Sequence, residues 1–154
     1  MNGNNPTIKT VEYRNALVDP AASVAGSAVV GSSAEWRDQI TRYPAIVHQH
    51  AVIREGARVQ AGVLRETIIG ERALIMGGAS IGHDTLIGAD VEVGAGAVIG
   101  GRCFIGAGAR IGSGTVVMNR VNIGENARVG IGAVVTRDIP ADQTWVGNPA
   151  RRLA

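Results

Sequence analysis

The chain has 154 residues, a formal net charge of +2 at pH 7 and only 3% aromatic residues. This length suits one domain with a sizeable core, and the scattered arginines, without interleaved aromatic residues, argue against a nucleic-acid partner. No hydrophobic run has membrane-spanning length and no signal peptide is evident, so we expect no membrane partner and a cytoplasmic protein.

The first part of the chain is only partly regular. Residues 1–16 are polar and lack a period, so we expect an N-terminal arm. A six-residue period of valines begins at Val18, breaks in residues 31–45, resumes at Val47 and slips by four residues at Val63. We interpret residues 31–45 as an insertion that projects from the repeating structure.

A strict six-residue period organises the stretch from Ile69 to Val135. Every sixth residue is Ile or Val, and the next residue is usually glycine. This period fits neither the 3.6 of a helix nor the 2 of an ordinary strand, and it predicts a parallel β-helix of hexapeptides. Three hexads make one triangular coil, so residue n stacks on residue n+18. The predicted ladders are Ile69/Ile87/Ile105/Ile123, Ile75/Val93/Ile111/Val129 and Ile81/Ile99/Val117/Val135.

The corners of the coils carry residues that tolerate a left-handed backbone. The third residue after each aliphatic position is Gly, Asn or Asp in nine of twelve hexads. These include Gly78, Asp84, Asp90, Gly96, Asn126 and Asp138. The single Cys103 falls at a small-residue position, which predicts a packed core thiol. We therefore predict a β-helix over residues 17–140, closed by a C-terminal cap over residues 141–154.

The hexad pattern resembles that of the hexapeptide-repeat acyltransferases. Their fold is an all-β, left-handed parallel β-helix, and the resemblance implies this handedness, which the period alone does not. The tail adds to the likeness. Ile123–Val135, Thr136–Pro140 and Gly147–Arg151 look like the C-terminal signature of the CoA-dependent hexapeptide acetyltransferases.

A second match lies upstream, in Tyr43–Ile53 and Ser80–Gly88. These stretches resemble the β-helix half of bacterial sugar acetyltransferases that act on sialic acid or amino sugars. In that group a His followed by an acidic residue is the general base pair, which implies His83 and Asp84 here. Two departures stand out: an N-terminal nucleotide-fold domain is not found in these 154 residues, and Glu92 stands where a second His often occurs.

The resemblance also implies a cofactor and an assembly. Acetyl-CoA would lie as co-substrate in a groove between the β-helices of a homotrimer, and a small polar acceptor, a sugar or nucleotide sugar, would receive the acetyl group. No metal is expected. The implied cofactor-binding residues are Glu92, Ala95, Gly112, Ser113, Gly130 and Ile131. Arg137, Arg151 and Arg152 could meet the CoA phosphates, or lie on the surface without a ligand.

The chemistry of acetyl transfer suits a histidine. The acceptor amine or hydroxyl must lose a proton as it attacks the thioester, and a base with a pKa near 6.5 can accept it at neutral pH. A neighbouring carboxylate can fix the tautomer of the imidazole. The structural alternatives are that His83 simply faces solvent at a corner and that Asp84 is there for its left-handed backbone.

Two other functions remain open from the sequence. His48 and His50, together with His83, could form the three-histidine metal site of a protein like the γ-class carbonic anhydrases, although the His-x₄-His spacing of that class is missing. Alternatively, the chain is a non-catalytic trimeric β-helix that serves as a scaffold or a glycan-binding part. Metal analysis and an acetyl-CoA binding assay separate these functions from the acetyltransferase.

Overall fold

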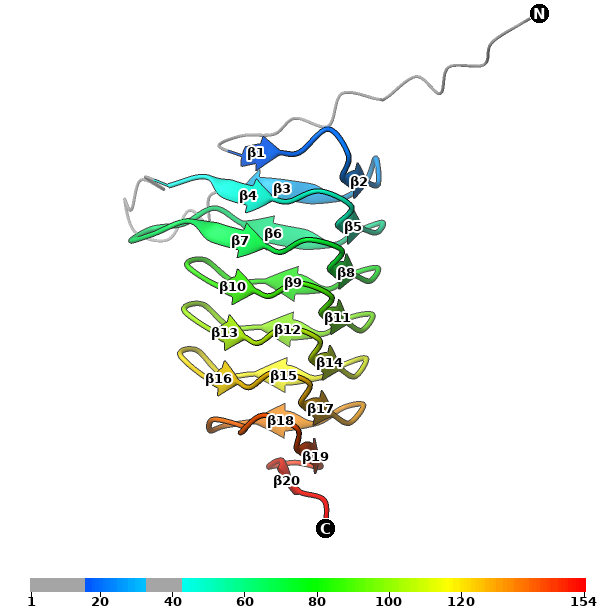
Figure 1. Cartoon of the computed structure of the whole chain (residues 1–154), viewed down its shortest axis with the longest axis vertical. Helices are drawn as coiled ribbons and strands as arrows, with labels where there is room; N and C mark the ends of the chain where they lie inside the picture. Colours follow the sequence, from blue (N-terminus) through cyan, green and yellow to red (C-terminus); the bar gives the residue numbers. More distant parts are fainter. Residues whose placement is uncertain (1–15, 33–42) are drawn as a thin grey trace, which may run out of the picture.

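The computed structural model describes residues 16–32 and 43–154, which form twenty short strands and no helix. Residues 1–15 of the expected N-terminal arm and residues 33–42 of the expected insertion lie outside these described ranges, and Ala16 already belongs to the first strand. The strands assemble into three sheets, parallel except for the last strand pair of the chain, and these sheets form the three sides of a prism. Figure 1 shows the strands stacked coil upon coil along one axis. We call them sheets A, B and C, in the order in which the chain visits them.

The three sheets share a regular order of strands. Sheet A contains β1 (Ala16–Val18), β4 (Ala45–Val47), β7 (Thr67–Ile69), β10 (Leu86–Ile87), β13 (Phe104–Ile105) and β16 (Asn122–Ile123). Sheet B contains β2 (Ser23–Val24), β5 (Val52–Ile53), β8 (Leu74–Ile75), β11 (Glu92–Val93), β14 (Arg110–Ile111), β17 (Arg128–Val129), β19 (Thr144–Val146) and β20 (Arg151–Arg152). Sheet C contains β3 (Val29–Ser32), β6 (Arg58–Gln60), β9 (Ser80–Ile81), β12 (Val98–Ile99), β15 (Val116–Val117) and β18 (Val134–Val135).

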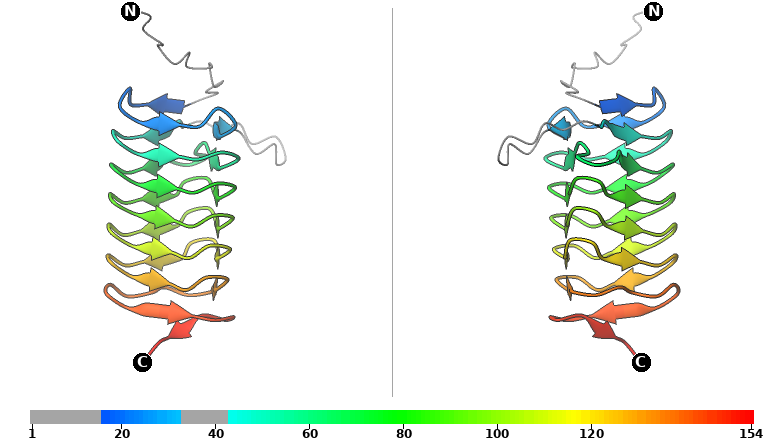
Figure 2. Two further views of the ribbon diagram at one scale, coloured as in Figure 1. Left: turned by 90° about the vertical axis from the view of Figure 1, so that its right-hand side faces the viewer. Right: turned by 90° about the vertical axis from the view of Figure 1, so that its left-hand side faces the viewer.

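The predicted fold class is confirmed: the chain is an all-β, left-handed parallel β-helix of hexapeptide repeats. Figure 2 shows the coils stacked one above another along a single axis. The predicted 18-residue stacking is also confirmed, because Ile87 pairs with both Ile69 and Ile105. All twelve ladder residues are buried, and burial of each contributes about 1.5–3 kcal/mol against the entropy of ordering the backbone. Cys103 is buried as predicted, and burial raises the pKa of its thiol.

The corner prediction is correct with one exception. Gly78, Asp84, Asp90, Gly96 and Asn126 have positive φ, but Asp138 does not. The reason is that the last coil is shorter: Arg128 pairs with Thr144, a separation of 16 residues instead of 18. In this coil the carboxylate of Asp138 accepts the backbone N–H of Asn122 at 2.7 Å, where a main-chain carbonyl serves the equivalent strands of the earlier coils.

The regular 18-residue coil is also interrupted near the N-terminal end. Ala16 pairs with Ala45, a separation of 29 residues, and Ala45 pairs with Thr67, a separation of 22. Both extra segments fall at the edge where sheet C passes into sheet A. They meet there, because Tyr43 and Gly62 form an antiparallel bridge.

The C-terminal end closes the stack. β19 adds to sheet B in parallel with β17, and β20 then reverses direction to pair antiparallel with β19. Trp145 of β19 is buried over the last coil, and its ring carries the guanidinium of Arg137 at 5.6 Å from the ring centroid. No helix in the described part of the chain could cross a membrane.

Candidate functional site

His83 and Asp84 lie together at the edge between sheets C and A, in the corner that joins β9 to β10. Nδ1 of His83 lies 2.9 Å from Oδ2 of Asp84. The Asp84 side chain is only 1% exposed, whereas the His83 side chain is 34% exposed. The left-handed backbone of Asp84, with φ at 59°, holds the two side chains side by side although the residues are adjacent in sequence. The imidazole is therefore neither a free surface group nor a core residue.

The carboxylate of Asp84 is held by main-chain donors. Its Oδ1 accepts three successive backbone N–H groups, those of Val63, Leu64 and Arg65, at 2.7, 2.8 and 3.1 Å. Burial opposes ionisation of this group, but the hydrogen bonds from His83 and from these three donors outweigh it and lower the pKa of Asp84 to about 2. Asp84 is thus a buried, permanently ionised partner for the imidazole near neutral pH.

The backbone of the pair is also tied in place. The N–H of Asp84 donates to Oγ1 of Thr67 at 2.9 Å, and the N–H of His83 donates to Oε1 of Gln60 at 3.1 Å. The guanidinium of Arg65 donates to the carbonyl oxygen of Asp84 at 3.1 Å. Every one of these partners lies in the preceding coil or in the loop that leaves it.

The next coil along the chain packs against the imidazole of His83. A Cβ added at Gly101 would lie 2.8 Å from Nε2 of His83, so only glycine leaves room for this position of the ring. Arg102, next to Gly101, places its Nε 3.6 Å from Oδ2 of Asp84, and among the described residues this buried Nε finds no hydrogen-bond acceptor. With Nδ1 turned to Asp84, Nε2 is the nitrogen at which a substrate proton can be accepted.

The other two histidines lie elsewhere. His48 and His50 are exposed in the corner between sheets A and B, which is a different edge from that of His83. The structure does not bring the three histidines together. Over residues 16–32 and 43–154, no group of three or more His, Cys, Asp or Glu side chains is arranged to hold a metal ion.

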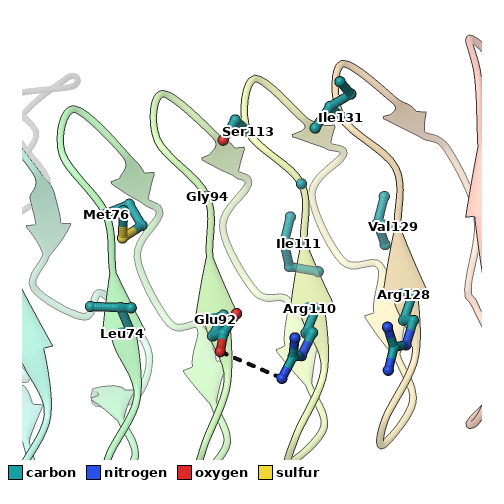
Figure 3. A pocket seen from close by; sticks show the side chains of 11 residues that line it. Leu74, Met76, Glu92, Gly94, Arg110, Ile111, Ser113, Arg128, Val129 and Ile131 are labelled. Atoms are coloured by element: carbon teal, nitrogen blue, oxygen red, sulfur yellow. Dashed lines mark ion pairs between the residues drawn. The ribbon is translucent and has the colours of Figure 1, made fainter.

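A groove of about 500 Å³ runs along the outer face of sheet B (Figure 3). Its lining residues are Leu74, Met76, Glu92, Gly94, Arg110, Ile111, Gly112, Ser113, Arg128, Val129 and Ile131. Apolar side chains form much of its wall, and Arg110 and Arg128 project into it from β14 and β17. The 3.7 Å ion pair between Glu92 and Arg110 is half exposed and contributes at most about 1 kcal/mol.

The groove takes in four of the six predicted cofactor-binding residues. Glu92, Gly112, Ser113 and Ile131 line it, whereas Ala95 and Gly130 lie at the same B–C edge outside its lining. Ile131 is 81% exposed at this edge. These positions remain predictions as ligand contacts.

The B–C edge has the barest backbone of the three edges. Its left-handed corner position is glycine in five successive coils, at Gly56, Gly78, Gly96, Gly114 and Gly132. The C–A edge, in contrast, has Asp84, Arg102 and Arg120 in this conformation. At these glycine positions no side chain separates the main chain from solvent, and a Cβ at Gly96, Gly114 or Gly132 would meet no atom within 4 Å.

The arginines of the tail have partial partners within the chain. Arg137 stacks on Trp145, and the guanidinium of Arg151 donates to the carbonyl oxygen of Ala150 at 2.9 Å. Sequence reasoning missed three parts of the site: the loop that holds Asp84, the buried Thr67 and the packing of Gly101 against His83. The slip in the period at Val63 was the visible signal for the first of these.

Comparison with known proteins agrees with this architecture. Residues 66–101 match the family model described as bacterial transferase hexapeptide (six repeats). A search of curated proteins found no significant match. Among solved structures, perosamine N-acetyltransferase from Caulobacter crescentus, in complex with CoA and GDP-perosamine, is 25% identical with a TM-score of 0.65. The match covers 91% of this chain and 58% of that enzyme.

Two further solved structures are similar. The acetyltransferase domain of PglB from Neisseria gonorrhoeae, in complex with acetyl coenzyme A, is 29% identical with a TM-score of 0.53, and the match covers 90% of this chain and 58% of that one. A hexapeptide transferase family protein from Anaplasma phagocytophilum is 26% identical with a TM-score of 0.75, covering 89% and 76%. The chain thus spans less than two thirds of the length of the perosamine N-acetyltransferase and of the PglB domain, and it is a hexapeptide-repeat β-helix similar in fold to the matched part of each.

Proposed function

We propose that this hexapeptide-repeat protein is an acetyl-CoA-dependent acetyltransferase that moves an acetyl group to an amine or hydroxyl of a small polar acceptor. The observation that carries the proposal is the His83–Asp84 pair, with its 2.9 Å contact, a carboxylate held by three main-chain donors, and an imidazole that is partly exposed and packs on Gly101. The likeness to a perosamine N-acetyltransferase and to an acetyltransferase domain with acetyl coenzyme A supports the reaction class. It also favours an amino sugar or nucleotide sugar as acceptor.

The proposed chemistry uses His83 as general base. Nε2 accepts the proton of the acceptor amine or hydroxyl while the nitrogen or oxygen attacks the thioester carbonyl carbon. Asp84 stabilises the imidazolium that forms, and it keeps the Nδ1–H tautomer beforehand. When the tetrahedral intermediate collapses, the C–S bond breaks, the proton passes to the departing sulfur, and acetylated acceptor and CoA thiol are released.

The groove on sheet B is the proposed site of the co-substrate. Its apolar wall suits the pantetheine arm, and Gly112 lines it, although the missing side chains of Gly112 and Gly130 leave room for the packing of the next turn of chain and not for a ligand. Glu92, Ala95, Ser113 and Ile131 complete the set of proposed contacts. The arginines at the groove suit the phosphate groups of CoA, because guanidinium binds phosphate through paired hydrogen bonds.

The relative position of groove and base favours a homotrimer. His83 lies at the C–A edge, whereas the groove lies on sheet B, so within one prism a thioester seated in the groove does not face Nε2. A neighbouring copy can present its groove to His83, and three prisms about one axis make three equal clefts. Exposed apolar side chains on both sheets next to His83, among them Val98, Phe104 and Val116, suit such packing. A reaction that consumes acetyl-CoA also suits the cytoplasm.

The test combines binding, activity and one substitution. Acetyl-CoA should raise the melting temperature, and a panel of amino sugars and nucleotide-linked amino sugars should release thiol in a coupled assay. His83→Asn should lower kcat by about 10²–10⁴ with little change in the Kd for acetyl-CoA, since Asn keeps the corner but accepts no proton there. Absence of any acetyl-CoA binding would instead favour the scaffold function, and full activity in His83→Asn would place the base elsewhere.

A further inference from the structure

The loop between β6 and β7 breaks the hexapeptide repeat directly beside the candidate base. Val59 and Ile69 occupy successive ladder positions, yet ten residues separate them instead of six. A regular corner would close this coil without extra chain, and each extra residue that is ordered costs backbone entropy. We therefore expect the loop to make contacts that offset the entropy cost of ordering it.

Three main-chain donors of the loop converge on one carboxylate. The three successive N–H groups of Val63, Leu64 and Arg65 all point to Oδ1 of Asp84, and no regular corner of the described coils supplies such a set to a side chain. Such convergent main-chain donors form a concave anion site. Because Oδ1 is fully engaged, Oδ2 is left to face Nδ1 of His83.

A second aspartate in the same backbone conformation serves as an internal comparison. Asp90 has φ at 57°, close to the 59° of Asp84, but it lies at the A–B edge and its side chain is half exposed. Within the described part of the chain, its carboxylate pairs only with the guanidinium of Arg72 in the preceding coil, at 2.7 Å. The left-handed corner therefore does not require a loop of donors, so the loop serves the particular orientation of Asp84.

Two further residues keep this arrangement in register. Thr67, fully buried at the end of the loop, accepts the backbone N–H of Asp84 through Oγ1. Gly62, at the start of the loop, could not carry a side chain, because a Cβ there would collide with the carbonyl oxygen of Arg65. The charged groups that face Asp84 from the packed elements are His83, Arg65 on its carbonyl oxygen, and Arg102 on Oδ2.

We propose that residues 62–65 and Thr67 form a positioning device, the Asp84 clamp, which fixes the carboxylate so that Oδ2 holds His83 in the Nδ1–H tautomer with Nε2 free to accept a proton. The clamp residues touch no substrate and act only through Asp84. The catalytic meaning of the clamp rests on the proposed function, but its effect on the tautomer does not. The break in the repeat is thus a device for orienting the base.

The test reads the tautomer of His83 by ¹⁵N NMR in the full chain, with His83→Asn used to assign its signals among the three histidines. In the wild type, Nδ1 should carry the proton at a pH at which the ring is neutral. Thr67→Val removes the acceptor of the Asp84 N–H, and Gly62→Ala forces the loop away from Oδ1. Both should give a mixture of tautomers, and where an acceptor is known, a kcat about tenfold lower with unchanged KM for acetyl-CoA.

Two matched variants separate positioning from stability. Thr115 is equally buried, and its Oγ1 donates to the carbonyl oxygen of Gly130 at 3.0 Å without contacting His83, so Thr115→Val should lose comparable stability while keeping the wild-type tautomer. Thr67→Ser keeps the hydroxyl and should restore both tautomer and kcat. A wild-type tautomer in folded Thr67→Val and Gly62→Ala would overturn the clamp. A wild type without transferase activity but with the expected NMR result would leave the clamp intact and refute only the proposed function.

Discussion

The pKa of Asp84 predicts a defined acid sensitivity of the fold. Its value falls from the ordinary 3.8 to about 2 in the folded chain, because His83 and the loop donors favour the ionised form. A depressed carboxyl pKa stabilises the folded state at every pH above the unfolded value, and this stabilisation is lost as the pH falls through the folded value. The difference corresponds to about 2 kcal/mol, most of which should disappear between pH 5 and pH 2.

The assay is urea denaturation at a series of pH values and a fixed protein concentration, for the wild type and for Asp84→Asn. The stability advantage of the wild type over Asp84→Asn should shrink by about 2 kcal/mol between pH 5 and pH 2. Asp90→Asn is the matched control, because it alters an exposed aspartate at the same kind of corner and should keep most of the acid sensitivity. Parallel curves for wild type and Asp84→Asn would refute the argument that the loop holds a buried carboxylate anion.

Three further predictions concern the packing of Gly101 against His83, the buried ladder and the groove on sheet B. Gly101→Ala should displace the imidazole and lower kcat about tenfold, as measured by steady-state kinetics, without changing the affinity for acetyl-CoA measured by calorimetry. Gly26→Ala is the control: a Cβ there meets no atom within 4 Å, so both kcat and the affinity should stay at their wild-type values. Ile105→Ala should cost about 2–5 kcal/mol in chemical denaturation, because the side chain is fully buried between coils. Ser113→Arg should fill the groove on sheet B and weaken acetyl-CoA binding at least tenfold by calorimetry while leaving the melting temperature without ligand nearly unchanged, since Ser113 is exposed.

The fold was predictable because the hexad encodes it locally. One aliphatic residue in six, followed by glycine, sets both the buried ladder and the close approach of coils; a Cβ at Gly88 would come within 3.0 Å of backbone atoms of the next coil. Residue type alone predicts the corners less completely. Arg72, Arg102 and Arg120 adopt positive φ although arginine has no preference for it, because stacking between regular corners imposes the backbone. Asp138 does not adopt positive φ, because the last coil is two residues shorter.

The site was predictable only as a pair of residues. His83 and Asp84 could be assigned by resemblance, and their adjacency made contact plausible, but the partners of Asp84 lie about twenty residues away in the stretch where the period fails. No repeat rule gives the path of such a loop. The same holds for Gly101, whose role depends on the ring of a residue one coil earlier. The roles of residues in irregular segments depend on contacts between coils, and a periodic sequence pattern does not predict those contacts.

The position of the irregularities is itself informative. Both departures toward longer coils fall at the edge between sheets C and A, on the N-terminal side of His83, and they bridge each other through Tyr43 and Gly62. The B–C edge, beside the groove, keeps glycine at the same corner position in five coils. In a fold whose stability depends on repetition, selection for stability alone would leave every edge alike. The contrast between one elaborated edge and one bare edge agrees with the proposed function, in which the base and its acceptor meet at the first edge and acetyl-CoA lies beside the second.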